Sequence, residues 1–280
     1  MVFLRTSLAA AFIAYATASP LVLPRQSPSS LAERAFSIKA GGSSGAGKPW
    51  PDGKIVWCFE SDSDDDDDYK EVLDLAKKAW KLWDDALDGK AKVEFKPKDD
   101  DKPRCDDDDE DDDQLLHIKF DDDAENLSDI GFSDEDRNTM EFNPKLSGDD
   151  KVVDFAHEIG HVLGLLHEHQ KPNAWKKAVD LNCENLDDYD DFKGDHNMDD
   201  LCKDQAKASQ AGFSAGEFLP LYGDFDQDDE FDEKSIMLYD SKTAAKEGKL
   251  TIVKVGGGEI KMPEKPSDSD VARVAKLYPD

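Results

Sequence analysis

The stretch His157–Glu168 reads HEIGHVLGLLHE and fits the pattern H-E-x-x-H-x-x-G-x-x-H. Within a helix, His157 and His161 stand one turn apart on the same face, so both imidazoles can reach one metal ion. Gly164 tolerates a positive φ and can end the helix, which lets the chain turn back and bring His167 to a third position. Three imidazoles leave a fourth coordination position open for water, as in a catalytic zinc site. The stretch therefore predicts one Zn2+ per chain, held by these three histidines.

Glu158 stands one residue further round the helix, beside the metal but not on it. Zinc lowers the pKa of its bound water toward about 7 and polarises a carbonyl group. Glu158 is then expected to take the proton of the water and pass it to the leaving amine as general base. His169 receives no metal role, because a fourth imidazole would close the open position. For His117 and His196, which stand alone, we expect ordinary packing or surface roles.

The chain has 280 residues and a formal net charge of -30, from 65 acidic and 35 basic side chains. A field of this sign repels phosphate backbones and anionic lipid headgroups. We therefore expect no nucleic-acid partner and no membrane partner, and we expect a monomer.

The first residues are typical of a secretory signal peptide over residues 1–18. Arg5 gives a short positive region, an apolar stretch too short to span a bilayer follows, and Ala16-Thr17-Ala18 is a small-x-small cleavage site. Residues 19–49 are rich in Pro, Ser and Gly, contain little that could form a core, and are interpreted as a pro-segment or flexible lead-in. Residues 50–280 are left as one catalytic domain of a secreted, extracellular protein.

Four cysteines in an exported chain favour two disulfides over free thiols. Four cysteines allow three pairings, and the sequence does not choose among them. We favour Cys58–Cys105 and Cys183–Cys202, which pair neighbours along the chain. A cysteine-ligated zinc site is the competing interpretation, but no C-x-x-C spacing is present.

The rest of the pattern predicts a domain of the α/β or α+β class. Apolar residues at helical spacing between Val72 and Leu87 predict a long amphipathic helix. A second helix is expected from Lys151 to about Gly164, and a last one over 267–277 with Ser267 and Asp270 at capping-box spacing. Strands are expected over 54–59, 93–95, 115–120 and 140–142.

Two strongly acidic runs, Asp62–Asp68 and Asp106–Asp113, are most simply solvated loops. Calcium binding is the functional alternative, because calcium prefers carboxylate oxygens. Neither run has the spaced D-x-D-x-D-G pattern, so calcium is only weakly supported as a cofactor.

Two segments resemble the astacin family of metzincin proteases. Glu168–Pro172 is similar to the family's continuation past the third histidine, although Lys171 stands where Arg is usual. Ser235–Tyr239 looks like the family's Met-turn, S-x-M-H-Y, although Leu238 stands where His is usual. The resemblance implies that Met237 forms a hydrophobic floor under the zinc and that Tyr239 stabilises the oxyanion. It also implies an α+β, zincin-like fold with a mixed twisted sheet, a long active-site helix and a Met-turn.

The resemblance extends more weakly to both ends, from Trp50–Gly53 to Asp270–Tyr278. Astacin-like enzymes are typically kept latent by a pro-segment Asp on the zinc, but residues 20–49 contain no Asp, Cys or His. Glu33 is the only acidic side chain there that could substitute for it. The resemblance further implies that Glu168 pairs with an ammonium group if maturation buries the new terminus.

The leading hypothesis is therefore a secreted zinc endopeptidase acting on protein or peptide substrates, with Glu158 and Tyr239 as catalytic residues. One alternative is a zinc-binding protein of the same fold that has lost catalysis. The other is an acidic calcium- or mineral-binding secreted protein in which the zinc site is secondary.

Overall fold

The computed structural model describes residues 36–40, 47–60, 66–106, 109, 114–122, 126–145, 151–173, 175–228 and 230–279. The predicted signal peptide and Glu33 lie outside these residues, as do most of the two acidic runs.

The first half of the chain forms a five-stranded mixed sheet with the strand order β2-β1-β3-β5-β4. The first four strands in this order run parallel, and β4 is antiparallel to β5 at the edge of the sheet. Every strand predicted from the sequence is present, whereas the two-residue strand β4 was not anticipated. The strands are β1 (Lys54–Glu60), β2 (Glu94–Pro97), β3 (Leu115–Phe120), β4 (Leu127–Ser128) and β5 (Asn138–Phe142).

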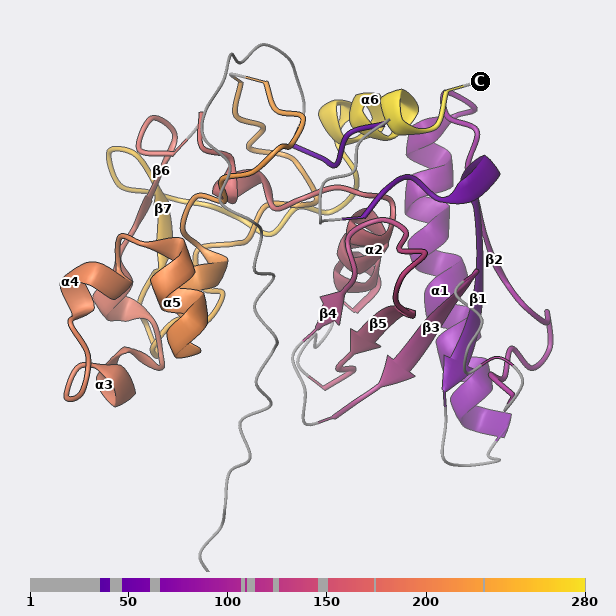
Figure 1. Cartoon of the computed structure of the whole chain (residues 1–280), viewed down its shortest axis with the longest axis horizontal. Coiled ribbons are helices and arrows are strands. Elements are labelled where there is room, and N and C mark those ends of the chain that lie inside the picture. Colours follow the sequence, from indigo (N-terminus) through magenta and orange to yellow (C-terminus); the bar gives the residue numbers. More distant parts are fainter. Residues whose placement is uncertain are drawn as a thin grey trace, which may run out of the picture.

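Two helices pack side by side against this sheet, α1 (Asp66–Leu87) and α2 (Lys151–Val162) (Figure 1). The apolar positions of α1 recur at helical spacing, so they form one buried stripe. Trp83 joins the two helices, because its indole Nε1 donates to the carbonyl of Ala156 at 2.8 Å. Every residue of α2 from Phe155 onward is buried, which places the metal-binding pattern inside the molecule.

The second half of the chain builds a separate, smaller hydrophobic cluster around a three-stranded sheet of order β6-β7-β8. The disulfide Cys183–Cys202 ties this part together, and Cys58–Cys105 ties β1 to the loop after β2, so both favoured pairings are present. Figure 1 shows this part beside the helices of the first half. Its elements are β6 (Val179–Leu181), α3 (Tyr189–Phe192), α4 (Met198–Leu201), α5 (Gln205–Ala211), β7 (Ile252–Lys254) and β8 (Gly258–Glu259).

The last helix, α6 (Asp268–Leu277), returns to pack near α1. Its predicted capping box is present: the Ser267 hydroxyl accepts from the amide of Asp270, and the Asp270 carboxylate accepts from the amide of Ser267. The predicted helix and its N-terminal cap are therefore confirmed.

The expectation that the segment before Trp50 contributes little to a core is wrong for Phe36 and Ile38, which are fully buried. Ser37 between them pairs with the backbone of Leu165 and of Asp226. Ser37 is itself only 1% exposed, so this short extended segment is buried on both sides. It lies against the turn that follows α2.

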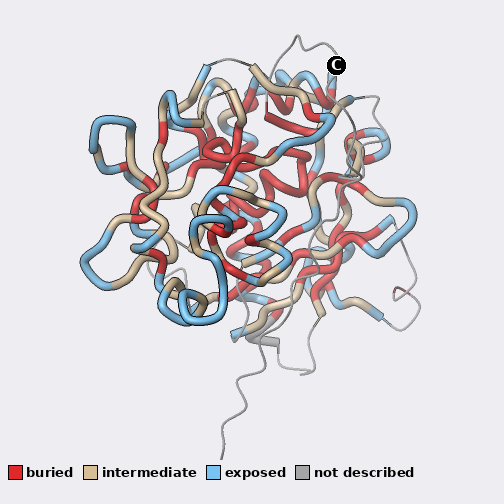
Figure 2. The backbone as a smooth tube through the Cα atoms, turned by 60° about the vertical axis from the view of Figure 1, so that its left-hand side comes forward, coloured by how far each residue is buried: buried red, intermediate tan, exposed pale blue. Residues whose placement is uncertain are grey.

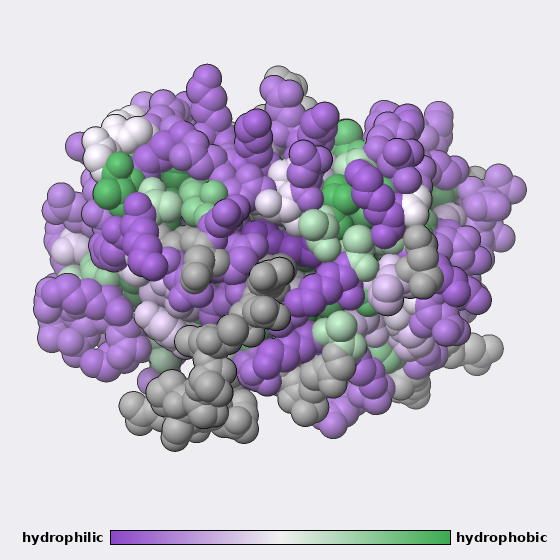
Figure 3. All heavy atoms as spheres, turned by 90° about the horizontal axis from the view of Figure 1, so that it is seen from above, coloured by the Kyte–Doolittle hydropathy of each residue, from purple (hydrophilic) through white to green (hydrophobic). Residues whose placement is uncertain are grey.

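Buried backbone runs through the centre of the molecule and exposed loops surround it (Figure 2). The face in Figure 3 is mostly hydrophilic, with hydrophobic residues in small separate areas. Within the described part of the chain, no helix is both long enough and apolar enough to cross a membrane.

Candidate metal centre

The structure brings His157, His161 and His167 together at the end of α2. The Nε2 atom of His167 lies 3.1 Å from Nε2 of His157 and 3.0 Å from Nε2 of His161. Nitrogen ligands at about 2.0–2.1 Å from one tetrahedral ion lie roughly 3.3 Å from each other. The spacing of the three imidazoles therefore fits a single zinc-sized ion.

The other ring nitrogen of each histidine is held by the protein. Nδ1 of His157 lies 2.7 Å from the carbonyl of Ile236, and Nδ1 of His161 lies 2.9 Å from the carbonyl of Leu165. A carbonyl oxygen only accepts, so in both rings Nδ1 carries the hydrogen and Nε2 keeps its lone pair. Both imidazoles are thereby fixed in the tautomer that a metal requires.

His167 is oriented by a side chain rather than by backbone. Its Nδ1 lies 3.2 Å from Oε1 of Gln170, whose amide nitrogen in turn donates to the carbonyls of Gly216 and Leu219. Gln170 was not identified from the sequence, although its place three residues after the third histidine puts it on the same turn.

Burial keeps the three imidazoles neutral. It lowers the pKa of His157 to about 4 and that of His161 to about 3, and it lowers the pKa of His167 well below its usual value. Neutral imidazole is the form that binds a metal ion. The centre is therefore ready to bind a cation near neutral pH without first losing protons.

Gly164 makes the turn that delivers the third histidine. Its φ is +98°, a left-handed conformation that favours glycine, and α2 has already ended at Val162. A Cβ at this position would lie 2.7 Å from the side chain of Ile38. The predicted sharp end of the helix is therefore present, and the buried segment before Trp50 packs directly on it.

Glu158 lies beside the three histidines and is 95% buried. Its Oε2 accepts a hydrogen bond of 2.6 Å from the hydroxyl of Ser128 on β4. Burial raises the pKa of Glu158 to about 7, which the hydrogen bond from Ser128 opposes. A carboxylate with such a pKa is suited to accept and return a proton near neutral pH.

The segment Ser235–Tyr239 contacts two of the histidines. Met237 is fully buried, and its sulfur lies 2.3 Å from the place where a Cβ on Gly160 would be. Gly160 occupies an unspecified position of the zinc pattern, so no pattern in the sequence distinguishes it. Its missing side chain allows the methionine to reach α2.

The ring of Tyr239 lies against the imidazoles, with its centroid 4.3 Å from that of His167 and 5.9 Å from that of His157. His169 packs on the other rings, 4.5 Å from Tyr239, and its Nε2 donates to the carbonyl of Glu217. His169 is thus fully buried among the rings beside the three-histidine group. Of the other two histidines, His117 is buried on β3 and His196 is exposed.

Glu168 is fully buried next to the third histidine, and the chain itself supplies its cationic partners. Nζ of Lys171 lies 2.8 Å from Oε1 of Glu168, and Nη1 of Arg273 lies 2.8 Å from Oε2. Lys171 also pairs with Asp228 at 2.8 Å. The ammonium expected to face Glu168 is therefore provided, in this structure, by an internal lysine; pairing with a matured terminus stays a prediction.

A second buried carboxylate links α6 to the metal centre. Asp270 accepts from the amide of Ile236 at 2.8 Å and from the hydroxyl of Ser235 at 2.6 Å. The carbonyl of Ile236 is the group that orients His157. The N-terminal turn of α6 therefore supports a metal-site histidine through the backbone of the Met-turn.

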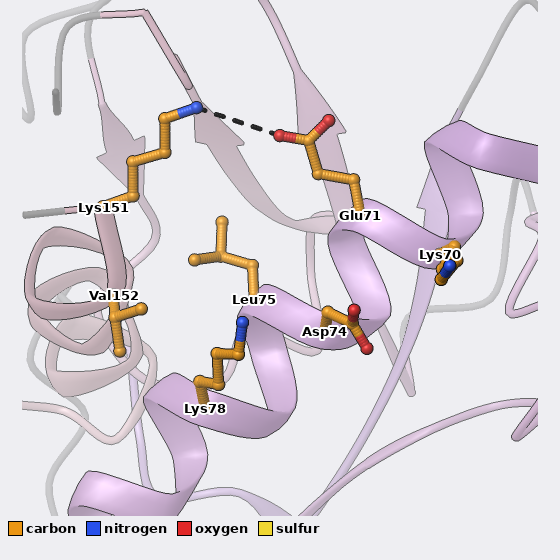
Figure 4. A pocket seen from close by; sticks show the side chains of 7 residues that line it. All are labelled: Lys70, Glu71, Asp74, Leu75, Lys78, Lys151 and Val152. Atoms are coloured by element: carbon orange, nitrogen blue, oxygen red, sulfur yellow. Dashed lines mark ion pairs between the residues drawn. The ribbon is translucent and has the colours of Figure 1, made fainter. Parts of the chain in front are cut away.

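Two other features of the described residues offer no rival site. Cys58, Cys105 and His117 lie close enough together to hold a metal, but both sulfurs are joined in a disulfide. A pocket of about 420 Å³ lies between α1 and α2, where Glu71 and Lys151 form an ion pair of 3.8 Å across it (Figure 4). Of the acidic runs, residues 66–68 form the start of α1, and Asp106 and Asp109 pair with Lys98 at 3.3 and 2.6 Å.

The described residues form an α+β fold with a histidine triad able to hold one metal ion. No family model and no curated protein matches the sequence. Among solved structures, the fold is similar to high choriolytic enzyme 1, a hatching-enzyme zinc protease of the medaka fish Oryzias latipes. The TM-score is 0.53 at 16% sequence identity, over 86% of this chain and 98% of that chain. It is also similar to myroilysin, with a TM-score of 0.51 at 18% identity, over 83% of this chain and 96% of that one. The predicted fold class is thereby confirmed.

Proposed function

We propose that this chain is a zinc-dependent endopeptidase whose metal ligands are His157, His161 and His167. The observation that carries the proposal is the convergence of three neutral imidazoles, each with its outer nitrogen held by the protein, beside the buried carboxylate of Glu158. Zinc is the ion for this donor set, because it accepts neutral imidazole in tetrahedral geometry. High choriolytic enzyme 1, one of the two similar structures named above, is a zinc protease, which supports the same activity here.

Each catalytic residue has a separate task. When bound, zinc supplies positive charge that makes water more acidic and a carbonyl more electrophilic. Glu158 accepts the proton of the attacking water and delivers it to the leaving amine. The hydroxyl of Tyr239, on a ring packed against His167, donates to the oxyanion that develops on the scissile carbonyl.

The edge strand β4 favours the proposal that the substrate is a polypeptide. It lies against α2 and pairs only with β5 among the described strands, so its outer edge can pair with an extended peptide. Such pairing would use the substrate's main chain and would accept internal peptide bonds. This favours an endopeptidase over an enzyme specific for small molecules.

Secretion, latency and the monomeric state belong to the same proposal. The two disulfides support an oxidising compartment, in agreement with the signal-like residues 1–18. Inhibition by Glu33 stays a prediction, and it is tested by comparing the latency of Glu33→Ala with that of its parent.

Selective chelation tests the function. We expect 1,10-phenanthroline to abolish hydrolysis of casein and added zinc to restore it. A calcium-selective chelator should leave the rate unchanged. Loss of function with the calcium chelator alone would instead favour the acidic calcium-binding alternative, and a zinc-loaded protein without peptidase activity would favour the inactive homologue.

A further inference from the structure

The hydroxyl of Ser128 makes the side-chain hydrogen bond that reaches the proposed general base. Ser128 Oγ lies 2.6 Å from Oε2 of Glu158 and 3.3 Å from the backbone carbonyl of the same residue. A serine hydroxyl has one hydrogen to donate, and a carboxylate oxygen at the shorter distance is the stronger acceptor. The hydrogen therefore goes to the carboxylate.

Burial gives this contact its importance. Ser128 is 8% exposed and Glu158 is 5% exposed, so solvent offers the carboxylate little competing hydrogen bonding. A glutamate has three side-chain torsions, and a base works only when its oxygen is within hydrogen-bond reach of the proton that it accepts. A donor fixed to one oxygen restricts the carboxylate to one orientation.

Ser128 is itself held firmly by the sheet. It is paired in antiparallel register with Met140 on β5, and the next residue, Asp129, donates its amide to the carbonyl of Thr139 at 3.0 Å. The carboxylate of Asp129 also accepts from the amide and the hydroxyl of Thr139. The hydroxyl that contacts the base therefore projects from a fixed backbone.

We propose that Ser128 is a positioning residue for the general base: its hydroxyl holds the Glu158 carboxylate in the orientation that accepts the proton of the attacking water. The inference rests on the proposed endopeptidase function. It also connects substrate binding with proton transfer. Ser128 lies on β4, the strand proposed to bind the substrate, and its hydroxyl contacts Glu158, the residue that transfers the proton.

The test compares Ser128→Ala, Ser128→Thr and the wild type on a peptide substrate. A hydrogen bond to a charged group is worth enough for Ser128→Ala to lower kcat by roughly 10- to 100-fold, with KM changed by less than about 3-fold. Ser128→Thr keeps the hydroxyl and should restore most of kcat. Ser133→Ala is the matched control, because it removes a serine hydroxyl that accepts from the amides of Glu135 and Asp136 and has no hydrogen bond to Ser128 or Glu158 in the described structure, and it should keep kcat.

Two further measurements separate positioning from general damage to the fold. Zinc content and zinc affinity of Ser128→Ala should equal those of the wild type, because the two hydrogen-bond contacts of the Ser128 hydroxyl in the described structure are both with Glu158 and not with a histidine of the centre. In a Glu158→Gln background, Ser128→Ala should lower the residual rate no further, because the two residues act as a unit.

If the wild type is active and Ser128→Ala has the same kcat, this inference alone is overturned. It is also overturned if Ser128→Ala loses kcat equally in the wild-type and the Glu158→Gln backgrounds. A zinc-loaded wild type without peptidase activity would overturn both this inference and the proposed function.

Discussion

Gly160→Ala is a sensitive test of how the Met-turn supports the metal centre. The added Cβ would lie 2.3 Å from the sulfur of Met237, whereas ordinary contact begins at 3.4 Å. The shortfall is 3.4 − 2.3 = 1.1 Å. Met237 is fully buried and cannot retreat into solvent, so either the sulfur or α2 must move.

Two opposing effects decide the free energy of unfolding. Overpacking a core costs about 1–3 kcal/mol, and a displacement above 1 Å favours the upper part of that range. Alanine in place of glycine within a helix raises the free energy of unfolding by about 1 kcal/mol. We therefore expect a net loss of about 1–2 kcal/mol, and a fall in Tm of about 2–8 °C. Because α2 carries two ligands, zinc affinity should fall by roughly 10-fold or more.

The assay is thermal unfolding together with zinc competition against a chromophoric chelator. Gly194→Ala is the matched control, since its added Cβ would meet nothing within 4 Å, and its Tm should stay the same or rise slightly. Met237→Ala added to Gly160→Ala removes the clash. The losses in the free energy of unfolding of the two single variants should therefore sum to more than the loss of the double variant. A Gly160→Ala protein with raised Tm and unchanged zinc affinity would refute the reasoning.

The remaining predictions concern residues that act on the oxyanion and on the metal ligands. Tyr239→Phe should lower kcat by about 10²–10³-fold with little change in KM. The control Tyr222→Phe alters an exposed residue and should change neither kcat nor KM. An effect of Tyr239→Phe confined to KM would mean that Tyr239 binds substrate. Asp270→Ala releases the amide of Ile236 and should lower zinc affinity by about 10-fold or more. The control Asp268→Ala removes an exposed carboxylate from the same helix turn, and equal zinc affinity in both variants would contradict the link from α6.

Much of this fold could be predicted because its signals are local. The apolar spacing of α1, the capping residues of α6 and the zinc pattern of α2 each lie within one short segment. Both disulfides join cysteines that are neighbours along the chain, the simplest of the three pairings.

The parts that the sequence did not reveal depend on contacts between distant segments. Ser128 lies on a strand of two residues, which is too short to show an alternating pattern of apolar and polar residues. Phe36 is buried because its segment pairs with the turn after α2 and with Asp226, and because its ring packs on Phe225. The partners of Glu168 include Arg273, which lies more than a hundred positions away. No local pattern encodes such pairings.

The central claim is tested most directly by the peptidase activity of Glu158→Gln, measured on casein at equal zinc content. The proposed role of Glu158 predicts that this variant keeps its zinc and its Tm and loses activity by about 10²–10⁴-fold, the usual contribution of a general base. Glu135→Gln, an exposed carboxylate outside the centre, should keep full activity. Wild-type turnover by zinc-loaded Glu158→Gln would contradict the account.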